Sequence, residues 1–294
     1  MASNETRYGI LVGVDGSQES DAAIRWAAAE AKMLDAPITL MHAAAATVTT
    51  WPMAPLPDVF IEAEQENATI VIGRARDVLE AEAGAGHGLD VRTDVQYSSP
   101  VPALADASKE ALMVVVGGSG MGALEKALLG SVSSGLVHYA HGPVVVVHTK
   151  DGRLPDSAAP VVLGIDGSPA SEAATKVAFA EADRRRAELL AVHSWSDVGI
   201  LPVPGRDLGE YEQRAEELLA ERLAGWREEY PDVVVKRRVV RDKPAQRLLE
   251  EARDAQLLVV GSRGRGGFTG MVLGSVGSTV AQSAQVPVIV VRPR

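Results

Sequence analysis

The sequence predicts an α/β protein made of two tandem, doubly wound domains, each with a five-stranded parallel sheet. One observation behind this prediction is an internal repeat that covers nearly the whole chain. The other is the alternation, within each copy, of short Val-rich apolar runs with stretches of helical periodicity. Such apolar runs suit parallel strands that are covered on both faces. With right-handed crossovers, the expected strand order is 3-2-1-4-5.

The repeat places equivalent residues 151 positions apart early in each copy and 144 positions apart later. GILVGVDGS at 9–17 recurs as VVLGIDGS at 161–168, and VVVGGSGMG at 114–122 recurs as LVVGSRGRG at 258–266. Each copy is long enough to bury its own core. We therefore expect domains at 1–150 and 159–294, joined by a linker at 151–158 that is rich in Gly, Pro, Asp and Ser.

The elements of each copy follow from local patterns. In the first copy the expected strands are the apolar runs near 8–14, 37–43, 90–96, 112–117 and 143–148. A helix is expected over 20–36, where Ile24, Ala27, Ala31 and Leu34 share a face and Pro37 ends the segment. In the second copy Ser168 and Pro169 provide an N-cap and a first-turn proline, and 208–229 carries an apolar stripe at helical spacing.

Composition narrows the range of functions. Lys and Arg number 29 against 39 Asp and Glu, a net charge of −10 that disfavours a nucleic-acid partner. The chain has no cysteine, which excludes disulfides, thiolate metal sites and cysteine nucleophiles and agrees with a reducing compartment. No stretch reaches the roughly 18 apolar residues of a membrane span. A cytoplasmic protein without a membrane span is expected.

Glycine-rich turns follow the first and fourth expected strands of each copy. In an open parallel sheet these two strands are neighbours at the switch point, where ligands bind. Glycines there let backbone N–H groups converge on phosphate oxygens, and the helix that begins after Gly130 adds unpaired N–H groups and its dipole. A glycine turn alone is equally well explained as a simple loop. Its recurrence at the same place in both copies favours phosphate binding.

The same glycines resemble a known motif. Gly117, Gly120 and Gly130-Ser131, with their counterparts in the second copy, match the spacing of the ATP-binding motif of the universal stress protein family. The resemblance covers nearly the whole chain twice, as in tandem actinobacterial and mycobacterial members. It implies a Rossmann-like fold of the adenine nucleotide α-hydrolase type and two ATP sites, one per domain, with Mg²⁺ between phosphates. It also implies a nucleotide-dependent regulator of growth or stress responses.

The resemblance assigns residues to parts of the nucleotide. The strand-end aspartate lies beside adenosine, the main chain after the strand-2 histidine reads adenine, and the glycine loops take ribose and phosphates. With Arg263 and Arg265, whose charge suits phosphate, and Asp197 after the second strand, the expected site residues are Gly13, Asp15, Ala43, Gly117, Gly118, Ser119, Gly120, Met121, Gly122, Ala123, Gly130, Ser131 and Val132 in the first domain, and Gly164, Asp166, Ser194, Asp197, Gly261, Ser262, Arg263, Gly264, Arg265, Gly266, Gly267, Gly274, Ser275 and Val276 in the second. Asp197 is equally explained as a solvated loop carboxylate.

Other interpretations stay open. An ATP-hydrolysing or adenylating enzyme of the same fold class is the alternative, but neither loop carries a catalytic Lys or base, so we assign no catalytic residue. His138 and His141 are spaced as metal ligands on a helix could be, yet without further ligands we expect no protein metal site. GxGxxA at 118–123 follows the wrong strand for a dinucleotide site. A homodimer and an unidentified protein partner are also expected.

Overall fold

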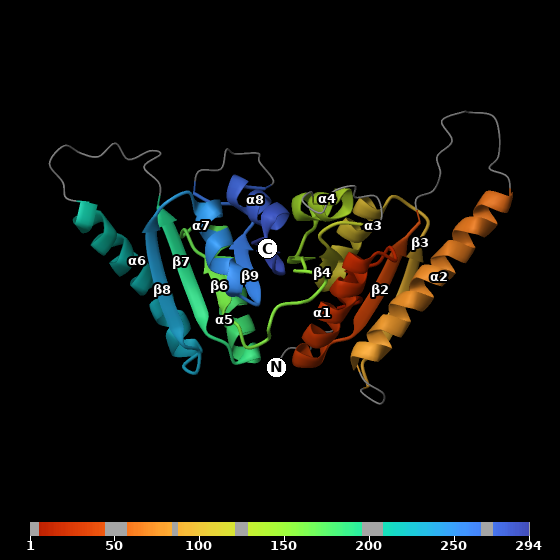
Figure 1. The fold of residues 1–294 in the computed structure, drawn as a ribbon, viewed down its shortest axis with the longest axis horizontal. Coiled ribbons are helices and arrows are strands. Elements are labelled where there is room, and N and C mark those ends of the chain that lie inside the picture. The colour runs from red at the N-terminus through yellow and green to blue at the C-terminus, as the bar shows by residue number, and fades with distance from the viewer. Residues whose placement is uncertain are drawn as a thin grey trace. The chain divides into compact units, whose positions relative to one another are not determined.

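A computed structural model describes residues 6–44, 58–83, 88–120, 129–195, 208–265 and 273–293. The chain divides into two compact units, Met1–Val147 and His148–Arg294 (Figure 1). No helix in these described ranges is both long enough and apolar enough to cross a membrane.

The first unit is a five-stranded parallel sheet with connecting helices. Its elements are β1 (Gly9–Gly13), α1 (Gln18–Leu34), β2 (Ile38–Ala43), α2 (Asp58–Ala83), β3 (Val91–Gln96), α3 (Pro100–Ala107), the 3₁₀ turn η1 (Ser108–Glu110), β4 (Ala111–Gly117), α4 (Ser131–Tyr139) and β5 (Val144–Val147). The pairs β3·β2, β2·β1, β1·β4 and β4·β5 are all parallel, which gives the order β3-β2-β1-β4-β5. The predicted fold class is confirmed.

The second unit repeats this plan. Its elements are β6 (Val161–Gly164), α5 (Pro169–Arg185), β7 (Leu189–Trp195), α6 (Leu208–Glu229), β8 (Val235–Arg241), α7 (Pro244–Glu251), η2 (Ala252–Asp254), β9 (Leu257–Gly261), α8 (Ser275–Ser283) and β10 (Val288–Val291). Parallel pairing gives β8-β7-β6-β9-β10. The residues before β6 include a tight turn at Lys150–Arg153, with Asp151 and Gly152 at positive φ.

The first helix of each unit begins at a serine cap. The Ser17 hydroxyl accepts a hydrogen bond from Ser20 N at 3.1 Å, and Ser168 accepts from Ser171 N at 3.2 Å. The cap expected at Ser168 is therefore confirmed. The same helices end at Asp35 and Arg186, whose φ values of 48° and 51° lie in the left-handed region that terminates helices.

The core of each unit is the sheet itself together with the inner faces of its helices. The central strands are buried along their length, and in the second unit Phe179 is fully buried between α5 and α6. Its ring lies 6.1 Å from that of Trp226 and 5.8 Å from that of Tyr230. Aromatic pairs at this separation add to the free energy of burial. Valine, leucine and alanine fill most of the remaining core.

A glycine at the end of the fourth strand lets the first helix approach the sheet closely. A Cβ built on Gly117 would lie 2.7 Å from the backbone carbonyl carbon of Glu19, and one on Gly261 would lie 2.6 Å from that of Ala170. Backbone atoms at this distance cannot yield without moving the helix. Both glycines thus set the distance between the helix start and the sheet, a packing role distinct from the phosphate role expected from the sequence.

We predict that Gly261→Ala destabilises the second unit by about 1–3 kcal/mol, because the added methyl overpacks against backbone. Gly225→Ala is the matched control, since a Cβ at this position in α6 would meet nothing within 4 Å. That substitution should stabilise the unit by about 0.5–1 kcal/mol through its helix propensity. Scanning calorimetry of the full chain measures both changes. Equal melting curves for the two variants would contradict the packing role of Gly261.

Candidate functional site

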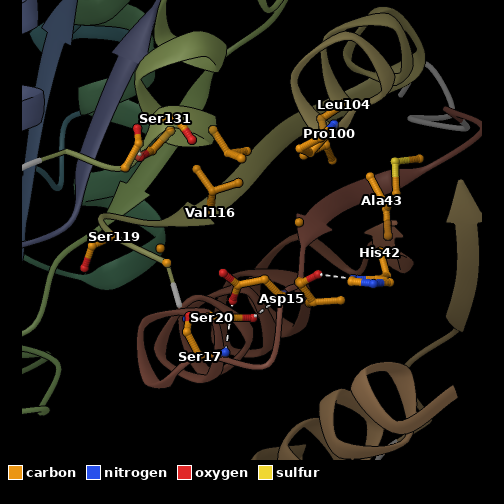
Figure 2. Close-up of a pocket in the computed structure, with 18 of the residues that line it drawn as sticks. Asp15, Ser17, Ser20, His42, Ala43, Pro100, Leu104, Val116, Ser119 and Ser131 are labelled. Atoms are coloured by element: carbon orange, nitrogen blue, oxygen red, sulfur yellow. Dashed lines mark hydrogen bonds between the residues drawn. The ribbon is translucent and has the colours of Figure 1, made fainter. Parts of the chain in front are cut away.

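A cavity of about 700 Å³ opens at the carboxyl edge of the first unit's sheet, between the ends of β1 and β4 (Figure 2). Such a volume is within the roughly 300–1,000 Å³ of small-molecule sites. The residues that line it come from the β1–α1 turn, β2, α3, β4 and the start of α4: Gly13, Val14, Asp15, Ser17, Ser20, Met41, His42, Ala43, Pro100, Leu104, Val116, Gly117, Ser119, Gly120, Leu129, Gly130, Ser131, Val132 and Ser133. The cavity thus lies at the switch point of the sheet.

Asp15 lies where the β1–α1 turn meets the glycine loop that follows β4. Its Oδ1 accepts a hydrogen bond from Ser17 N at 3.0 Å, which fixes the carboxylate in the turn. A Cβ on Gly120 would lie 2.6 Å from Asp15 Oδ2. The carboxylate therefore faces the loop backbone directly, and this close approach requires a glycine at 120.

The glycine loop is fastened to the start of α4. Gly130 N donates to Gly118 O at 2.8 Å, and the Ser133 hydroxyl donates to the same carbonyl at 3.0 Å. Gly130 is the N-cap of α4 and has no side chain to bond the first-turn N–H groups. Ser131 and Val132 of that turn line the cavity. The positive end of the helix dipole is thus available to an anion.

The opposite end of the cavity is apolar. Figure 2 shows Leu104 and Pro100 from α3 facing the end of β2, with the serines of the glycine loop and α4 on the other side. His42 is buried, and its Nδ1 lies 2.8 Å from Val14 O, so this nitrogen carries the proton and donates. That bond ties the end of β2 to the end of β1. Ala43 follows directly and lines the cavity.

The second unit has the same loop arrangement. Asp166 Oδ1 accepts from Ser168 N at 2.9 Å, and its Oδ2 accepts from Arg265 N at 3.0 Å. The Ser168 hydroxyl donates to Arg263 O at 3.0 Å. The bonds to Arg265 N and Arg263 O join the β6–α5 turn to the glycine loop after β9. Gly274 N also donates to Ser262 O at 2.7 Å, which ties the loop to the start of α8.

Most of the expected site residues of the first unit gather around its cavity. They are Gly13, Asp15, Ala43, Gly117, Ser119, Gly120, Gly130, Ser131 and Val132. Gly118 does not line it; this residue is buried and its carbonyl holds α4. Ser262, the equivalent residue of the second unit, is also buried. Met121, Gly122, Ala123, Asp197, Gly266 and Gly267 lie outside the described residues.

Sequence reasoning missed the contribution of α3. Pro100 and Leu104 line the cavity, and a Cβ on Gly13 would lie 3.0 Å from Leu104 Cδ1. In the second unit Leu248 lies 2.9 Å from a Cβ built on Gly164. The signal was present, because Leu104 and Leu248 are separated by the same 144 residues as the glycine loops. An apolar residue that recurs in this way has the same pattern as ordinary core, so the sequence alone does not mark it as part of a site.

In the described part of the chain, the two histidines that are spaced as metal ligands bond backbone carbonyls. Within the described ranges, no group of three His, Asp or Glu side chains is placed to hold a metal ion. His138 Nδ1 lies 2.8 Å from Ser134 O, and His141 Nδ1 lies 3.2 Å from Ala105 O. Both rings therefore bond backbone carbonyls near helix ends.

The fold and the glycine loops define a tandem α/β protein with one switch-point site motif in each unit. The sequence profile of the universal stress protein family matches residues 9–148 and 159–292. The chain therefore belongs to the universal stress protein family.

Relatives of known sequence agree over the full length. A universal stress protein of Mycolicibacterium smegmatis is 59% identical over 294 residues, 100% of both chains. One of Mycobacterium tuberculosis is 50% identical over 99% of each chain. Among solved structures, a universal stress protein from Archaeoglobus fulgidus matches with a TM-score of 0.71 at 22% identity, covering 99% of both chains. That last likeness concerns the fold.

We predict that Asp166→Asn loosens the glycine loop of the second unit. Asparagine can replace one acceptor oxygen, but its amide nitrogen cannot accept the Arg265 N–H. Hydrogen exchange at the Arg265 amide should accelerate about tenfold, the effect of losing one charge-assisted bond at a partly exposed position. The comparison is Ser168→Ala, which removes the hydroxyl that donates to Arg263 O and leaves the Asp166 carboxylate in place. An unchanged exchange rate in Asp166→Asn would show that the carboxylate does not hold the loop.

Proposed function

We propose that this chain is a cytoplasmic ATP-binding regulator of stress responses, with one nucleotide site per unit and little catalytic turnover. The observation that carries the proposal is the first unit's cavity, which combines an apolar end with an anion-binding end at the switch point. An adenine nucleotide has the same two-ended character. Spacing of the glycine motif in both copies supports a second site.

The apolar end suits an adenine ring. Leu104, Pro100 and Val116 offer aliphatic surface, and the main chain at Ala43 offers hydrogen-bonding groups to the edge of a base. The short bond from His42 to Val14 O holds that main chain in place. Asp15 stands between the two ends, where a ribose would lie beside its carboxylate (Figure 2).

The other end suits phosphates. Loop N–H groups around Gly120 and the first turn of α4 present donors and the positive end of a dipole. The Ser131 hydroxyl adds a donor at the same end. Mg²⁺ bound by protein usually takes one or two carboxylates together with substrate phosphates. Among the described residues that line the cavity, Asp15 carries the carboxylate, and the metal would neutralise phosphate charge.

A binding role fits the side chains better than catalysis. Among the described residues that line the cavity there is no lysine to act on a phosphate, and His42 is turned toward the Val14 carbonyl. An ATP-hydrolysing or adenylating enzyme needs a positioned base or cation beside the phosphates. Regulation would then depend on nucleotide occupancy, read by a protein partner or a second copy of the chain.

Copurified nucleotide is the direct test. Acid extraction of the purified chain should release ATP, and millimolar Mg-ATP should raise the melting temperature by several degrees. A ligand at a hundred times its Kd stabilises the native state by about 2.7 kcal/mol per site. NAD should give a smaller shift because its second nucleoside has no counterpart in the site. Absence of both copurified ATP and a thermal shift would refute ATP binding.

Stoichiometry separates the two sites. Gly120→Glu places a carboxylate against Asp15 and in the phosphate space, so the number of ATP molecules bound per chain should fall from two to one. Gly264→Glu should do the same at the second site, because a Cβ there would also lie 2.6 Å from the equivalent aspartate. Equilibrium dialysis with circular dichroism as the folding control measures this. Two ATP per chain in a folded Gly264→Glu protein would show that its loop does not hold phosphate.

A further inference from the structure

The glycine loops of the two units differ in charge at two equivalent positions. Ser119 of the first loop corresponds to Arg263, and Met121 corresponds to Arg265. At the first of these positions the loop backbone lies equally close to the start of the following helix in both units. A Cβ on the N-cap glycine of the following helix would lie 3.4 Å from the Cα of Ser119 in one unit and 3.4 Å from that of Arg263 in the other. Arg263 therefore occupies the place of a residue that lines the first cavity.

In the described part of the first site, the lining side chains carry no positive charge. Its described lining residues include one carboxylate, Asp15, and no Lys or Arg. Among these described residues, a highly charged ligand would meet a carboxylate and backbone dipoles without a cationic side chain to offset its charge.

The second loop holds its two arginines on a fastened backbone. Ser168 Oγ donates to Arg263 O, and Asp166 Oδ2 accepts from Arg265 N at 3.0 Å. Both arginines are exposed, so their guanidinium groups can reach a ligand in front of the loop. Burial, and in second place the positive charge of Arg263, lowers the pKa of Arg292 beyond the end of β10. Arg263 and Arg292 are therefore close enough at this edge of the second sheet to interact electrostatically.

We propose that the two sites select adenine nucleotides by phosphate charge. The second site takes the triphosphate through Arg263 and Arg265 without needing a metal. The first takes a ligand of low phosphate charge, either a monophosphate or a triphosphate neutralised by a divalent cation. This inference rests on the proposed function, since it assigns a preference to each of the two nucleotide sites. Guanidinium–phosphate bonds are charge-assisted and stronger than bonds from neutral donors.

The test measures each site alone in the full chain. Calorimetric titration of Gly264→Glu reports the first site, and titration of Gly120→Glu reports the second. In EDTA the second site should bind ATP at least about tenfold more tightly than AMP, a ratio expected for charge-assisted contacts. The first site should bind AMP as tightly as ATP in EDTA and should gain ATP affinity when Mg²⁺ is added. Added salt should weaken ATP binding more at the second site.

A charge exchange between the loops identifies the residues responsible. In the Gly120→Glu background, Arg263→Ser with Arg265→Met should bring the ATP-to-AMP ratio close to one. Arg227→Ser with Arg253→Met is the matched control, because these exposed arginines lie near the amino edge of the sheet and the net charge changes equally. In the Gly264→Glu background, Ser119→Arg with Met121→Arg should create the preference in the first site.

The outcomes are distinguishable. If both sites rank ATP and AMP alike in EDTA, the charge selection is wrong while nucleotide binding stands. If the control pair lowers the ratio as much as the loop pair, general charge and not the loop is responsible, and the inference is overturned. If neither site binds an adenine nucleotide, the proposed function itself fails.

Discussion

Parallel pairing of the first strand with the fourth is the constraint on which each unit depends. The chain leaves β1 toward β2 on one side and returns through β4 on the other, so the two carboxyl ends meet with no crossover helix above them. The register that brings Val12 beside Val115 also brings the turn after Gly13 beside the loop after Gly117. In the first unit the cavity forms at this junction. Residues separated by about a hundred positions become neighbours there.

Close packing at this junction leaves little room for side chains. The start of the first helix lies against Gly117 in one unit and Gly261 in the other. The aspartate carboxylate lies against Gly120 and Gly264, three residues further along each loop. Two glycines of one motif therefore serve different purposes. The earlier one admits helix backbone, and the later one admits a carboxylate. The spacing of the glycines in the sequence predicts a phosphate-binding loop, but it does not reveal these two packing roles, because it does not say which atoms approach each Cα.

Local patterns in the sequence predicted much of the fold. Apolar runs located the strands, the Ser168–Pro169 pair located a helix start, and the repeat predicted that both units share one plan. The glycine spacing also predicted which loops lie at the cavity. The α3 wall was missed because Leu104 looks like any core leucine until the fold brings it against Gly13. Contacts of this kind depend on which elements become neighbours, information that short sequence windows lack.

Duplication has kept the backbone of the two units alike while individual side chains changed. Val71 of α2 lies near Gly16, whereas Arg222 lies at the equivalent place against Gly167. Yet each unit still joins its second helix to its first by an ion pair, Arg74 with Asp21 at 2.6 Å and Arg222 with Glu172 at 2.8 Å. The arginine of this ion pair stands about one helical turn later in α2 than in α6, and both units keep an ion pair between the two helices. The glycine loops differ in the same way. Arg263 stands where the first unit has Ser119, on loop backbone equally close to the following helix, and the two loops present different charges to a ligand.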